Sequence, residues 1–565
     1  MTPHISGASR MRLPKLVAVA ALPAFLAAAT AVLARGGDPD QTFGTNGTVA
    51  LRTASDNVAY RMATAADGTT VAVRMASTTI DVQRFLATGR PDPSWGTNGT
   101  ATLPAQITVL AVMVQANGRV MLGGTLTSGP GWGFARLTQG GNLDPTFADA
   151  GWSLLSGTGP AAAFGMALHQ QDDARIVAVA YPIDGATFGH TAVLRLTTDG
   201  RLDTTYGVNG VVDPAFAFSW TGHPVAAERV LGDGATELSR PAAASIAVGR
   251  LRGDGTSDST RSFAVPFSLA DENAPLLASQ PDGALVVATL GFDSASQRSV
   301  LKVARFSSRG TLDQTLGVQG IATVKLAPST LGGVFATPDG QWVAIVAPQA
   351  GTGFQVVKLG LDNLHLDTRF ASAGTLAVTT FAEDAAAMGP DGFLTVLVQS
   401  NGGQHDGGLL RLQAVGDIVE FHNAVLDHYF IALDGAEAAG IDAGNAGPGW
   451  SRTHAAFTPG GVAPVCRFYG TPGIGPNSHF YTAQPAECAL VKQDPGWTLE
   501  GTGFYATRIV SGGCAAPLVA VHRLYNNGFA QGIDSNHRYV TELGLINLMQ
   551  GQGWIYEGIV FCARP

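Results

Sequence analysis

The sequence predicts an all-β-dominant protein, a seven-bladed β-propeller followed by a smaller, pseudo-threefold, β-rich domain that contains disulfides. Three observations predict this fold class. One motif recurs seven times between residues 36 and 415, and a second motif recurs three times between residues 416 and 565. Gly and Pro supply 72 and 30 of the 565 residues, while only 14% of the chain is charged. This composition disfavours long charged helices and indicates short strands joined by turns.

The first 34 residues have the pattern of a secretory signal peptide. Arg10, Arg12 and Lys15 precede an alanine-rich apolar run from Leu16 to Ala34. Basic residues, a short apolar stretch and small residues before the cut are typical of cleaved export signals. We therefore expect cleavage near Ala34 and a secreted protein, extracellular or periplasmic, with a retained membrane anchor as the alternative. No membrane span is expected in the mature chain, because no later apolar run has the length to cross a bilayer.

The propeller prediction depends on two series of positions that stay in register. One series is an aspartate, usually followed by an aromatic residue and a glycine, at steps of 52, 52, 59, 55, 55 and 54 residues. The other is a basic residue before an apolar one, and in its first five copies it lies eight residues ahead of the next aspartate. Two independent series at one spacing indicate a fixed unit with seven copies. The aspartates are Asp40, Asp92, Asp144, Asp203, Asp258, Asp313 and Asp367, and the basic residues are Arg84, Arg136, Arg195, Arg250, Arg305, Lys358 and Arg411.

One unit accommodates four short strands, which the first copy predicts at residues 48–52, 59–65, 70–75 and 80–86, with a hairpin turn at Asp67-Gly68. A unit of this size cannot bury both faces of its sheet alone, so neighbouring units must stack. Radial stacking gives a propeller, and a β-solenoid is the competing architecture. At the junction between units we expect the aspartate to accept backbone N–H groups of the next turn, the aromatic side chain to be buried between sheets, and the glycine to adopt a positive φ.

The junction pattern Gly200-Arg201-Leu202-Asp203-Thr204-Thr205-Tyr206-Gly207-Val208-Asn209-Gly210 resembles the delta-60 repeat of exported bacterial proteins. That family is taken to build propellers and has no established reaction, so the resemblance implies a fold and export. The copy at Gly255-Thr256-Ser257-Asp258 is degraded and lacks the aromatic residue.

The region 416–565 contains a different repeat, with three copies. The second copy contains Arg467-Phe468-Tyr469, His479-Phe480-Tyr481 and Trp497, and the others follow the same order, although the first lacks the leading Arg and the Glu-Gly pair after Trp. Each copy predicts two strands, a short helix and a closing strand opened by Trp. The pattern resembles a C-terminal repeat domain of unknown function found in many secreted bacterial proteins, sometimes beside cell-wall hydrolases, and the resemblance implies an attachment module.

All four cysteines lie in this last region, an even number that predicts disulfides in an exported chain. Four cysteines permit three pairings. We favour Cys466 with Cys488 and Cys514 with Cys562, because each bridge then stays within one repeat. None of the spacings matches a zinc knuckle, so no metal site and no cofactor are predicted.

Six aromatic residues of the repeats are candidates for ligand binding. His428, His479 and His537 are predicted to occupy equivalent positions, either as structural histidines or converging on a ligand. Each repeat also has one tryptophan that is either a platform for a sugar ring or part of the core. These tryptophans are Trp450, Trp497 and Trp554.

The sequence predicts an exported, non-catalytic binding or adhesion scaffold, in which a propeller displays a C-terminal recognition module for an extracellular glycan, a cell-wall component or a protein. No catalytic motif was found, so no catalytic residue is predicted. A secreted enzyme with its site at the propeller channel mouth and a structural or assembly protein remain alternatives. The net charge of −9 argues against a nucleic-acid partner. The oligomeric state stays open.

Overall fold

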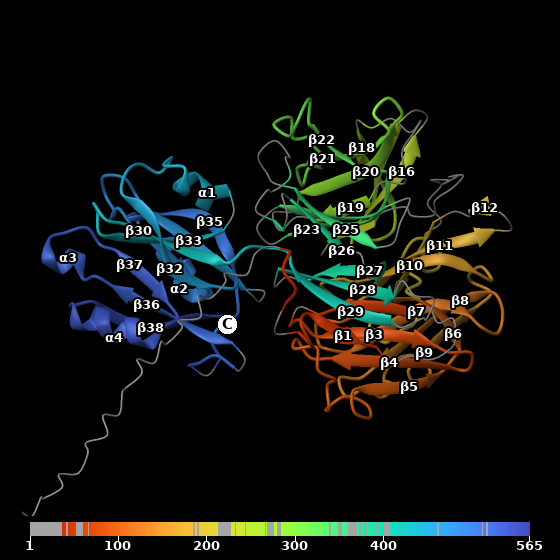
Figure 1. The fold of residues 1–565 in the computed structure, drawn as a ribbon. Helices are drawn as coiled ribbons and strands as arrows, with labels where there is room; N and C mark the ends of the chain where they lie inside the picture. Colours follow the sequence, from red (N-terminus) through yellow and green to blue (C-terminus); the bar gives the residue numbers. More distant parts are fainter. Residues whose placement is uncertain are drawn as a thin grey trace, which may run out of the picture. The chain divides into compact units, whose positions relative to one another are not determined.

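The computed structural model describes most of the chain between residues 37 and 564 (Figure 1). The predicted signal peptide, residues 1–34, lies outside the described residues, so its cleavage near Ala34 stays a prediction. None of the helices in the described part of the chain combines the length and apolarity needed to cross a membrane. Between residues 37 and 564 the segments left undescribed are 41–42, 52–59, 66, 185–186, 189–190, 213–227, 232, 243–244, 266, 268–275, 280–283, 338–340, 349–352, 360–365, 367–369, 372–373, 379–380, 390–391, 401–406, 435, 460–462, 511 and 516–517.

The described residues of the first repeat region form seven antiparallel sheets with four strands each on the main path, and β12 (Thr187–Phe188) adds to β11. The first sheet contains β2 (Tyr60–Thr64), β3 (Thr70–Met75), β4 (Thr79–Phe85) and β5 (Thr100–Pro104), and the second contains β6 (Ile107–Val114), β7 (Val120–Leu126), β8 (Gly131–Leu137) and β9 (Trp152–Ser156). The third contains β10 (Ala163–Gln170), β11 (Ile176–Asp184), β13 (Ala192–Leu196) and β14 (Val211–Val212), and the fourth contains β15 (Glu228–Val230), β16 (Thr236–Ala242), β17 (Ser245–Leu251) and β18 (Ser257–Val265). The fifth contains β19 (Leu276–Ser279), β20 (Leu285–Asp293), β21 (Arg298–Phe306) and β22 (Ile321–Leu326), and the sixth contains β23 (Ser329–Ala336), β24 (Trp342–Pro348), β25 (Phe354–Leu359) and β26 (Thr375–Val378). The last sheet contains β27 (Phe381–Met388), β28 (Phe393–Ser400), β29 (Gly407–Gln413) and β1 (Thr48–Ala50).

These sheets stack in a closed ring. The first strand of a sheet lies against the first strand of its neighbour at six seams, including the seam between β27 of the last sheet and β2 of the first. At the seventh seam Gln171 donates a hydrogen bond from its side chain to the carbonyl of Gly234, at 3.2 Å. Separate clusters of buried apolar side chains fill the spaces between neighbouring sheets, again including the last and the first. This stacking is radial, as predicted.

The sheets are offset by one strand from the sequence repeat. All four strands predicted in the first copy are present, as β1 to β4, but β1 pairs with β29 in the last sheet (Figure 1). The register sets Thr48 opposite Leu410 and Ala50 opposite Gly408. The offset joins the two ends of the ring by backbone hydrogen bonds.

The junction motif forms the predicted contacts between sheets. The aromatic side chain is fully buried at Phe43, Trp95, Phe147 and Tyr206. The glycine that follows adopts the left-handed conformation, as at Gly96 with a φ of 56°. A Cβ atom on Gly96 would lie 2.3 Å from the carbonyl oxygen of Thr100, so a side chain would clash with backbone there.

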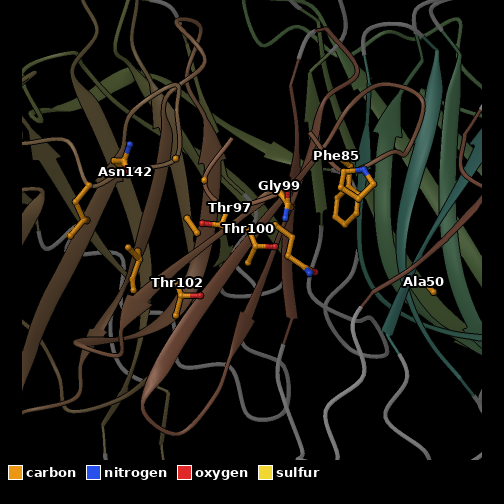
Figure 2. A pocket seen from close by; sticks show the side chains of 15 residues that line it. Ala50, Phe85, Thr97, Gly99, Thr100, Thr102 and Asn142 are labelled. Carbon is orange, nitrogen blue, oxygen red and sulfur yellow. The ribbon is translucent and has the colours of Figure 1, made fainter. Parts of the chain in front are cut away.

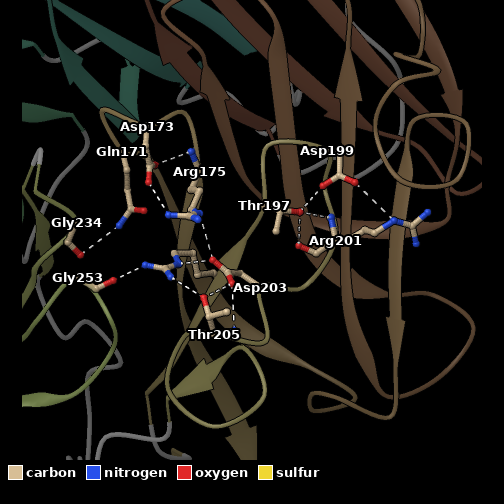
Figure 3. Close-up of polar contacts among 11 residues, drawn as sticks. Gln171, Asp173, Arg175, Thr197, Asp199, Arg201, Asp203, Thr205, Gly234 and Gly253 are labelled. Atoms are coloured by element: carbon tan, nitrogen blue, oxygen red, sulfur yellow. Dashed lines mark hydrogen bonds and ion pairs between the residues drawn. The ribbon is translucent and has the colours of Figure 1, made fainter.

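The two sequence series meet in an ion pair that also joins neighbouring sheets (Figure 3). Asp203 accepts hydrogen bonds at Oδ1 from the backbone N–H and the hydroxyl of Thr205, at 3.1 and 2.6 Å, and its Oδ2 lies 2.9 Å from Nε of Arg195. The guanidinium of Arg195 lies 4.6 Å from the centre of the Tyr206 ring and donates to the carbonyl of Gly253 in the next sheet's turn. The same contact to the next sheet is made by Arg84 to Gln139 at 3.3 Å, by Arg136 to Thr198 at 2.7 Å and by Arg411 to Ala87 at 2.8 Å.

The degraded copy departs from this pattern. Arg250 lies eight residues before Asp258, but its guanidinium contacts Asp233 at 3.1 Å instead, and Asp258 contacts Arg252 at 3.5 Å. An aromatic ring is nevertheless present at this junction, since a Cβ atom on Gly310 would lie 2.8 Å from Phe263, as one on Gly200 would lie 2.4 Å from Phe147.

The C-terminal region forms three antiparallel three-stranded sheets, each with the opening strand of its repeat in the middle. The short helices predicted in the second and third copies are confirmed. The predicted boundaries of the two domains, 36–415 and 416–565, stay predictions. The elements are β30 (Ile418–Asn423), β31 (His428–Leu433), α1 (Ala436–Asp442) and β32 (Trp450–Phe457); β33 (Ala463–Gly470), β34 (His479–Thr482), α2 (Pro485–Val491) and β35 (Trp497–Ala506); β36 (Val519–Tyr525), α3 (Gly528–Gln531), β37 (His537–Val540), α4 (Leu543–Gly551) and β38 (Ile555–Ala563).

Equivalent residues of the three repeats meet in one core. Phe457, Phe504 and Phe561 each follow their repeat's tryptophan by seven residues. Their ring centroids lie 6.2, 5.5 and 6.1 Å apart, so each ring packs on the other two. This contact confirms the predicted pseudo-threefold arrangement.

Both predicted disulfides are present. Cys466 in β33 bonds to Cys488 in α2, and Cys514 bonds to Cys562 in β38. Each bridge stays within its own repeat, which was the reason for favouring this pairing.

Candidate functional site

A pocket of about 520 Å³ lies between the first and second C-terminal repeats. Its wall combines aromatic rings with amide and hydroxyl groups, and Glu437 of α1 is the one carboxylate on the described wall. The rings are those of Tyr429, Phe430, Trp450 and Tyr469 with the imidazoles of His428 and His479, and the amides and hydroxyl are those of Asn445, Asn477, Asn536 and Ser478.

The rings of the wall support one another. Phe430 lies edge-on to Trp450, with ring centroids 6.3 Å apart, and 4.6 Å from His479. Tyr469, on the opening strand of the second repeat, has its ring centroid 4.8 Å from that of His479. Trp450, Tyr469 and His479 are half-buried, so one part of each ring packs on protein and another part faces solvent. These ring contacts pre-form the aromatic side of the pocket.

Hydrogen bonds place the polar side of the pocket. Tyr469 donates its hydroxyl hydrogen to Oδ1 of Asn477, at 2.8 Å. Asn536 comes from the third repeat and is almost completely buried. Its Oδ1 accepts from the backbone N–H of Tyr429 at 2.9 Å, and its Nδ2 donates to the carbonyl of the same residue at 3.3 Å. The third repeat therefore fixes the strand that carries Tyr429 and Phe430.

The arginine, histidine and glutamate of the repeat motif contact one another next to the pocket, and the histidine, His479, also lines it. Arg467 lies between two carboxylates, with Nη1 2.7 Å from Glu437 of the preceding repeat and Nε 2.9 Å from Glu500 of its own. Nε2 of His479 lies 3.3 Å from the same Glu500. Hydrogen bonding by His479, together with the charge of Arg467, lowers the pKa of Glu500. Arg467 thus ties the helix of one repeat to the closing strand of the next.

The third repeat contains the same arrangement. Arg523 lies 2.8 Å from Glu487 of the second repeat and 2.7 Å from Glu557 of its own. His537 lies 3.7 Å from Glu557. The sequence contained the residues of this cluster, but the pairing of an arginine with the preceding repeat's helix was not predicted.

The prediction that His428 is equivalent to His479 and His537 is wrong. His479 and His537 lie opposite Tyr469 and Tyr525 in their hairpins, with ring centroids 4.8 and 5.2 Å apart. In the first repeat the corresponding pair is His422 and Tyr429, at 4.6 Å. Matching the histidines by identity shifted the first copy by one residue, and a shift of one residue in a strand moves a side chain to the other face.

The three predicted histidines do not converge on one point. His428 and His479 line the pocket, whereas His537 packs between Phe480 and Tyr525, with both ring distances 5.2 Å. Within the described ranges, no group of three His, Cys, Asp or Glu side chains is arranged to hold a metal ion.

The three predicted tryptophans are all half-buried, and one lines the pocket. Trp450 combines with the other rings of the wall. Trp497 packs on Phe480 at 5.6 Å, and Trp554 lies edge-on to Tyr429 at 5.9 Å. Trp450 is therefore the tryptophan that the structure brings together with predicted histidines in a cavity.

Stability should depend on pH through His537. Its burial, with the nearby charge of Arg523, lowers the pKa of this imidazole to about 3. An unfolded histidine has a pKa of about 6.5, so as the pH falls the unfolded state binds the proton first, and the stability contributed by the neutral ring, present above the unfolded pKa, is lost. We expect this group to lower the free energy of unfolding by about 2 kcal/mol between pH 7 and pH 5.

Thermal unfolding of the full chain across this pH range, compared with a His537→Gln variant, measures the effect. The variant should show a shallower dependence on pH. Equal slopes for the two proteins would contradict the prediction.

A larger pocket, of about 880 Å³, lies on the propeller (Figure 2). Its wall comes from β5 and the turn before it, from residues 141–143 of the next repeat, and from Ala50 of β1, Gln83 and Phe85 of β4, and Pro91. Figure 2 shows Thr97, Thr100 and Thr102 between Asn142 and Ala50. The described wall contains no carboxylate, imidazole, amine or thiol, which are the groups that acid–base catalysis most often uses.

Two family models match parts of the chain. A domain of unknown function, DUF5648, matches residues 427–564, and a second one described as a β-propeller, DUF5122, matches residues 115–147 and 171–206. With the closed ring of sheets, the second match confirms the predicted propeller fold. Neither description names the delta-60 repeat, so that resemblance stays a prediction. No curated protein matches the sequence.

Solved structures of similar fold have low sequence identity to this chain. These structures include an alpha-L-arabinanase of Penicillium chrysogenum in complex with arabinobiose (11% identity, 54% of this chain and 92% of that chain, TM-score 0.34), the polysaccharide lyase Uly1 (10%, 68% and 98%, 0.36) and the propeller domain of the Trilobed protease of Pyrococcus furiosus (6%, 64% and 97%, 0.38). Identities and TM-scores this low carry no information about activity.

Proposed function

We propose that the protein is an exported, non-catalytic glycan-binding protein. Its C-terminal domain binds a sugar in the pocket between the first and second repeats, and its propeller is the display scaffold. The observation that carries this proposal is the pocket wall itself, where half-buried Trp450 and Tyr469 rings stand beside the amides of Asn445 and Asn477.

The chemistry of this wall suits a carbohydrate. A sugar ring has apolar C–H faces that pack on aromatic rings and hydroxyl groups that exchange hydrogen bonds with amides. Asn445 and Asn477 are exposed at the rim, and because Oδ1 of Asn477 accepts from Tyr469, this residue offers chiefly its Nδ2 to a ligand. A volume of about 520 Å³ is within the range of small-molecule sites. Aromatic packing and directional hydrogen bonds together select a sugar over a purely apolar ligand.

The single carboxylate on the described pocket wall favours sugar binding over hydrolysis of a glycosidic bond. Hydrolysis of a glycosidic bond generally requires two carboxyl groups on either side of that bond. The described wall has Glu437 alone, and this carboxylate is paired with Arg467 at 2.7 Å. Two disulfides are consistent with export to an oxidising compartment.

The proposal is tested by comparing two tryptophan variants of the full chain on a glycan panel that includes cell-wall polysaccharides. Trp450→Ala should weaken binding at least tenfold, about 1.4 kcal/mol, because it removes the largest ring of the wall. Trp497→Ala is the matched control, since Trp497 is the equivalent residue of the second repeat and packs outside the described wall.

Calorimetry gives the affinities, and thermal unfolding shows whether both variants remain folded. Binding restricted to proteins, binding to no glycan, or equal loss in the two variants would overturn the proposal.

A further inference from the structure

We infer that the pocket selects an amino sugar with a free amine, a hexosamine unit whose nitrogen is not acetylated, and that the ammonium group lies against Glu437. This inference rests on the proposed function and specifies the class of sugar. It depends on the charges around the pocket and on the rings beside Glu437.

Glu437 has a carboxylate oxygen available for a ligand. Its Oε2 is 2.7 Å from Nη1 of Arg467, and its Oε1 makes no hydrogen bond with any residue that the structure describes. The side chain is 47% exposed, and it lines the pocket. An ammonium group entering the pocket can therefore reach Oε1 while Arg467 keeps Oε2.

The charges around the pocket leave an excess of negative charge. Arg467 is shared between Glu437 and Glu500, so these three side chains together carry one net negative charge. The wall has no lysine or arginine among its described residues. A cationic ligand would therefore be attracted to this pocket, and a uronic acid would be repelled.

His428 does not offset this negative charge. It is 5% exposed, and its burial lowers its pKa, against the opposing effect of Asp534 and Asp427. The lowered pKa favours the neutral imidazole at pH 7, so His428 adds no positive charge to the pocket.

The rings of the wall add a second preference for a cation. An ammonium group over the face of an indole or phenol ring is attracted by the ring quadrupole, most strongly for tryptophan. Trp450 and Tyr469 line the pocket together with Glu437. Acetylation of the sugar nitrogen removes the charge, and with it both the ion pair and the attraction to the rings.

The rim amides distinguish a sugar from a simple quaternary ammonium ligand. Asn445 and Asn477 are exposed polar groups that suit several hydroxyls. Choline has one hydroxyl and would leave most of these groups to water. The combination of cation and polyol is what the wall complements.

The experiment measures binding of the full chain to choline and to β-linked oligomers of equal length made of glucosamine, N-acetylglucosamine and glucose, by calorimetry at a pH where the amine is protonated. The glucosamine oligomer should bind at least fivefold more tightly than the other two, and added salt should reduce this preference. Glu437→Gln should reduce the preference for glucosamine by at least about twofold, because the attraction between unit charges is lost, while the smaller preference due to the rings remains.

Glu487→Gln is the matched control. Glu487 holds the equivalent arginine, Arg523, at 2.8 Å in the next repeat and lies outside the described wall of the pocket. This variant should keep the preference for glucosamine, and thermal unfolding shows whether both variants are folded.

The outcomes separate the inference from the proposed function. Equal binding of all three oligomers, or tighter binding of choline than of glucosamine, overturns the inference and leaves the glycan proposal to the tryptophan test. Binding of none of the oligomers overturns the inference as well. If in addition Trp450→Ala changes no binding on the wider panel, the proposed function fails too.

Discussion

Replacing Arg195 with alanine is expected to lower the free energy of unfolding of the propeller by about 2–3 kcal/mol. Arg195 and Asp203 are 7% and 5% exposed in their side chains, and their closest atoms lie 2.9 Å apart. The variant leaves Arg175, at 3.2 Å, as the arginine that still contacts Asp203. It also removes the cation from the Tyr206 ring and breaks the bond to Gly253, which is the contact that reaches the next sheet.

Arg305→Ala is the control for this prediction. Arg305 and Asp313 form the equivalent pair in another copy, but their atoms lie 3.5 Å apart and both side chains are about a quarter exposed, at 27% and 26%. Solvent screens such a pair, so we expect a loss of about 1 kcal/mol or less. Thermal unfolding followed by circular dichroism compares the two variants. Equal destabilisation by both substitutions would show that burial does not set the strength of these junctions.

Removing the Cys514–Cys562 disulfide should destabilise the C-terminal domain by about 4 kcal/mol. The bridge closes a loop with a sequence separation of 48 residues, whereas Cys466–Cys488 closes one of 22. Since a longer loop loses more entropy in the unfolded state when it is closed, removing the shorter bridge should cost less, about 3.4 kcal/mol.

The two bridges are compared by replacing both cysteines of one bridge with serine at a time. Denaturant unfolding of each double variant, set against the oxidised wild-type chain, gives the two losses. A larger loss from the variant that lacks Cys466 and Cys488 would contradict the prediction from loop length.

The junctions show how far local pattern predicts this fold. A spacing of eight residues between Arg195 and Asp203 reflects a hairpin whose turn returns the aspartate to the arginine. The same pair forms at three other copies of this spacing, whereas in the degraded copy Arg250 contacts Asp233. The sequence alone predicted the cap, the buried ring and the positive φ of the glycine. It did not predict that four of these arginines would also bond to a carbonyl of the next sheet, because that carbonyl lies 55 or more residues away along the chain. They are Arg84, Arg136, Arg195 and Arg411.

The C-terminal repeats show where pattern fails. Identical residues suggested that His428 matches His479, but the hairpin register pairs His422 with Tyr429 instead. Register depends on which backbone groups bond across the strands, and a short motif with two adjacent aromatic residues does not specify it.

The sequence by itself determined the repeats, the turns and the choice of disulfide partners, since each depends on residues near one another in the chain or within one copy. Only the tertiary structure decided which candidates form a site. Trp450 and His479 come from different repeats, and the strand beneath them is held by Asn536 of a third. Packing of the three repeats around the Phe457, Phe504 and Phe561 core brings these segments together, and no local pattern encodes a distance between side chains that are far apart in sequence.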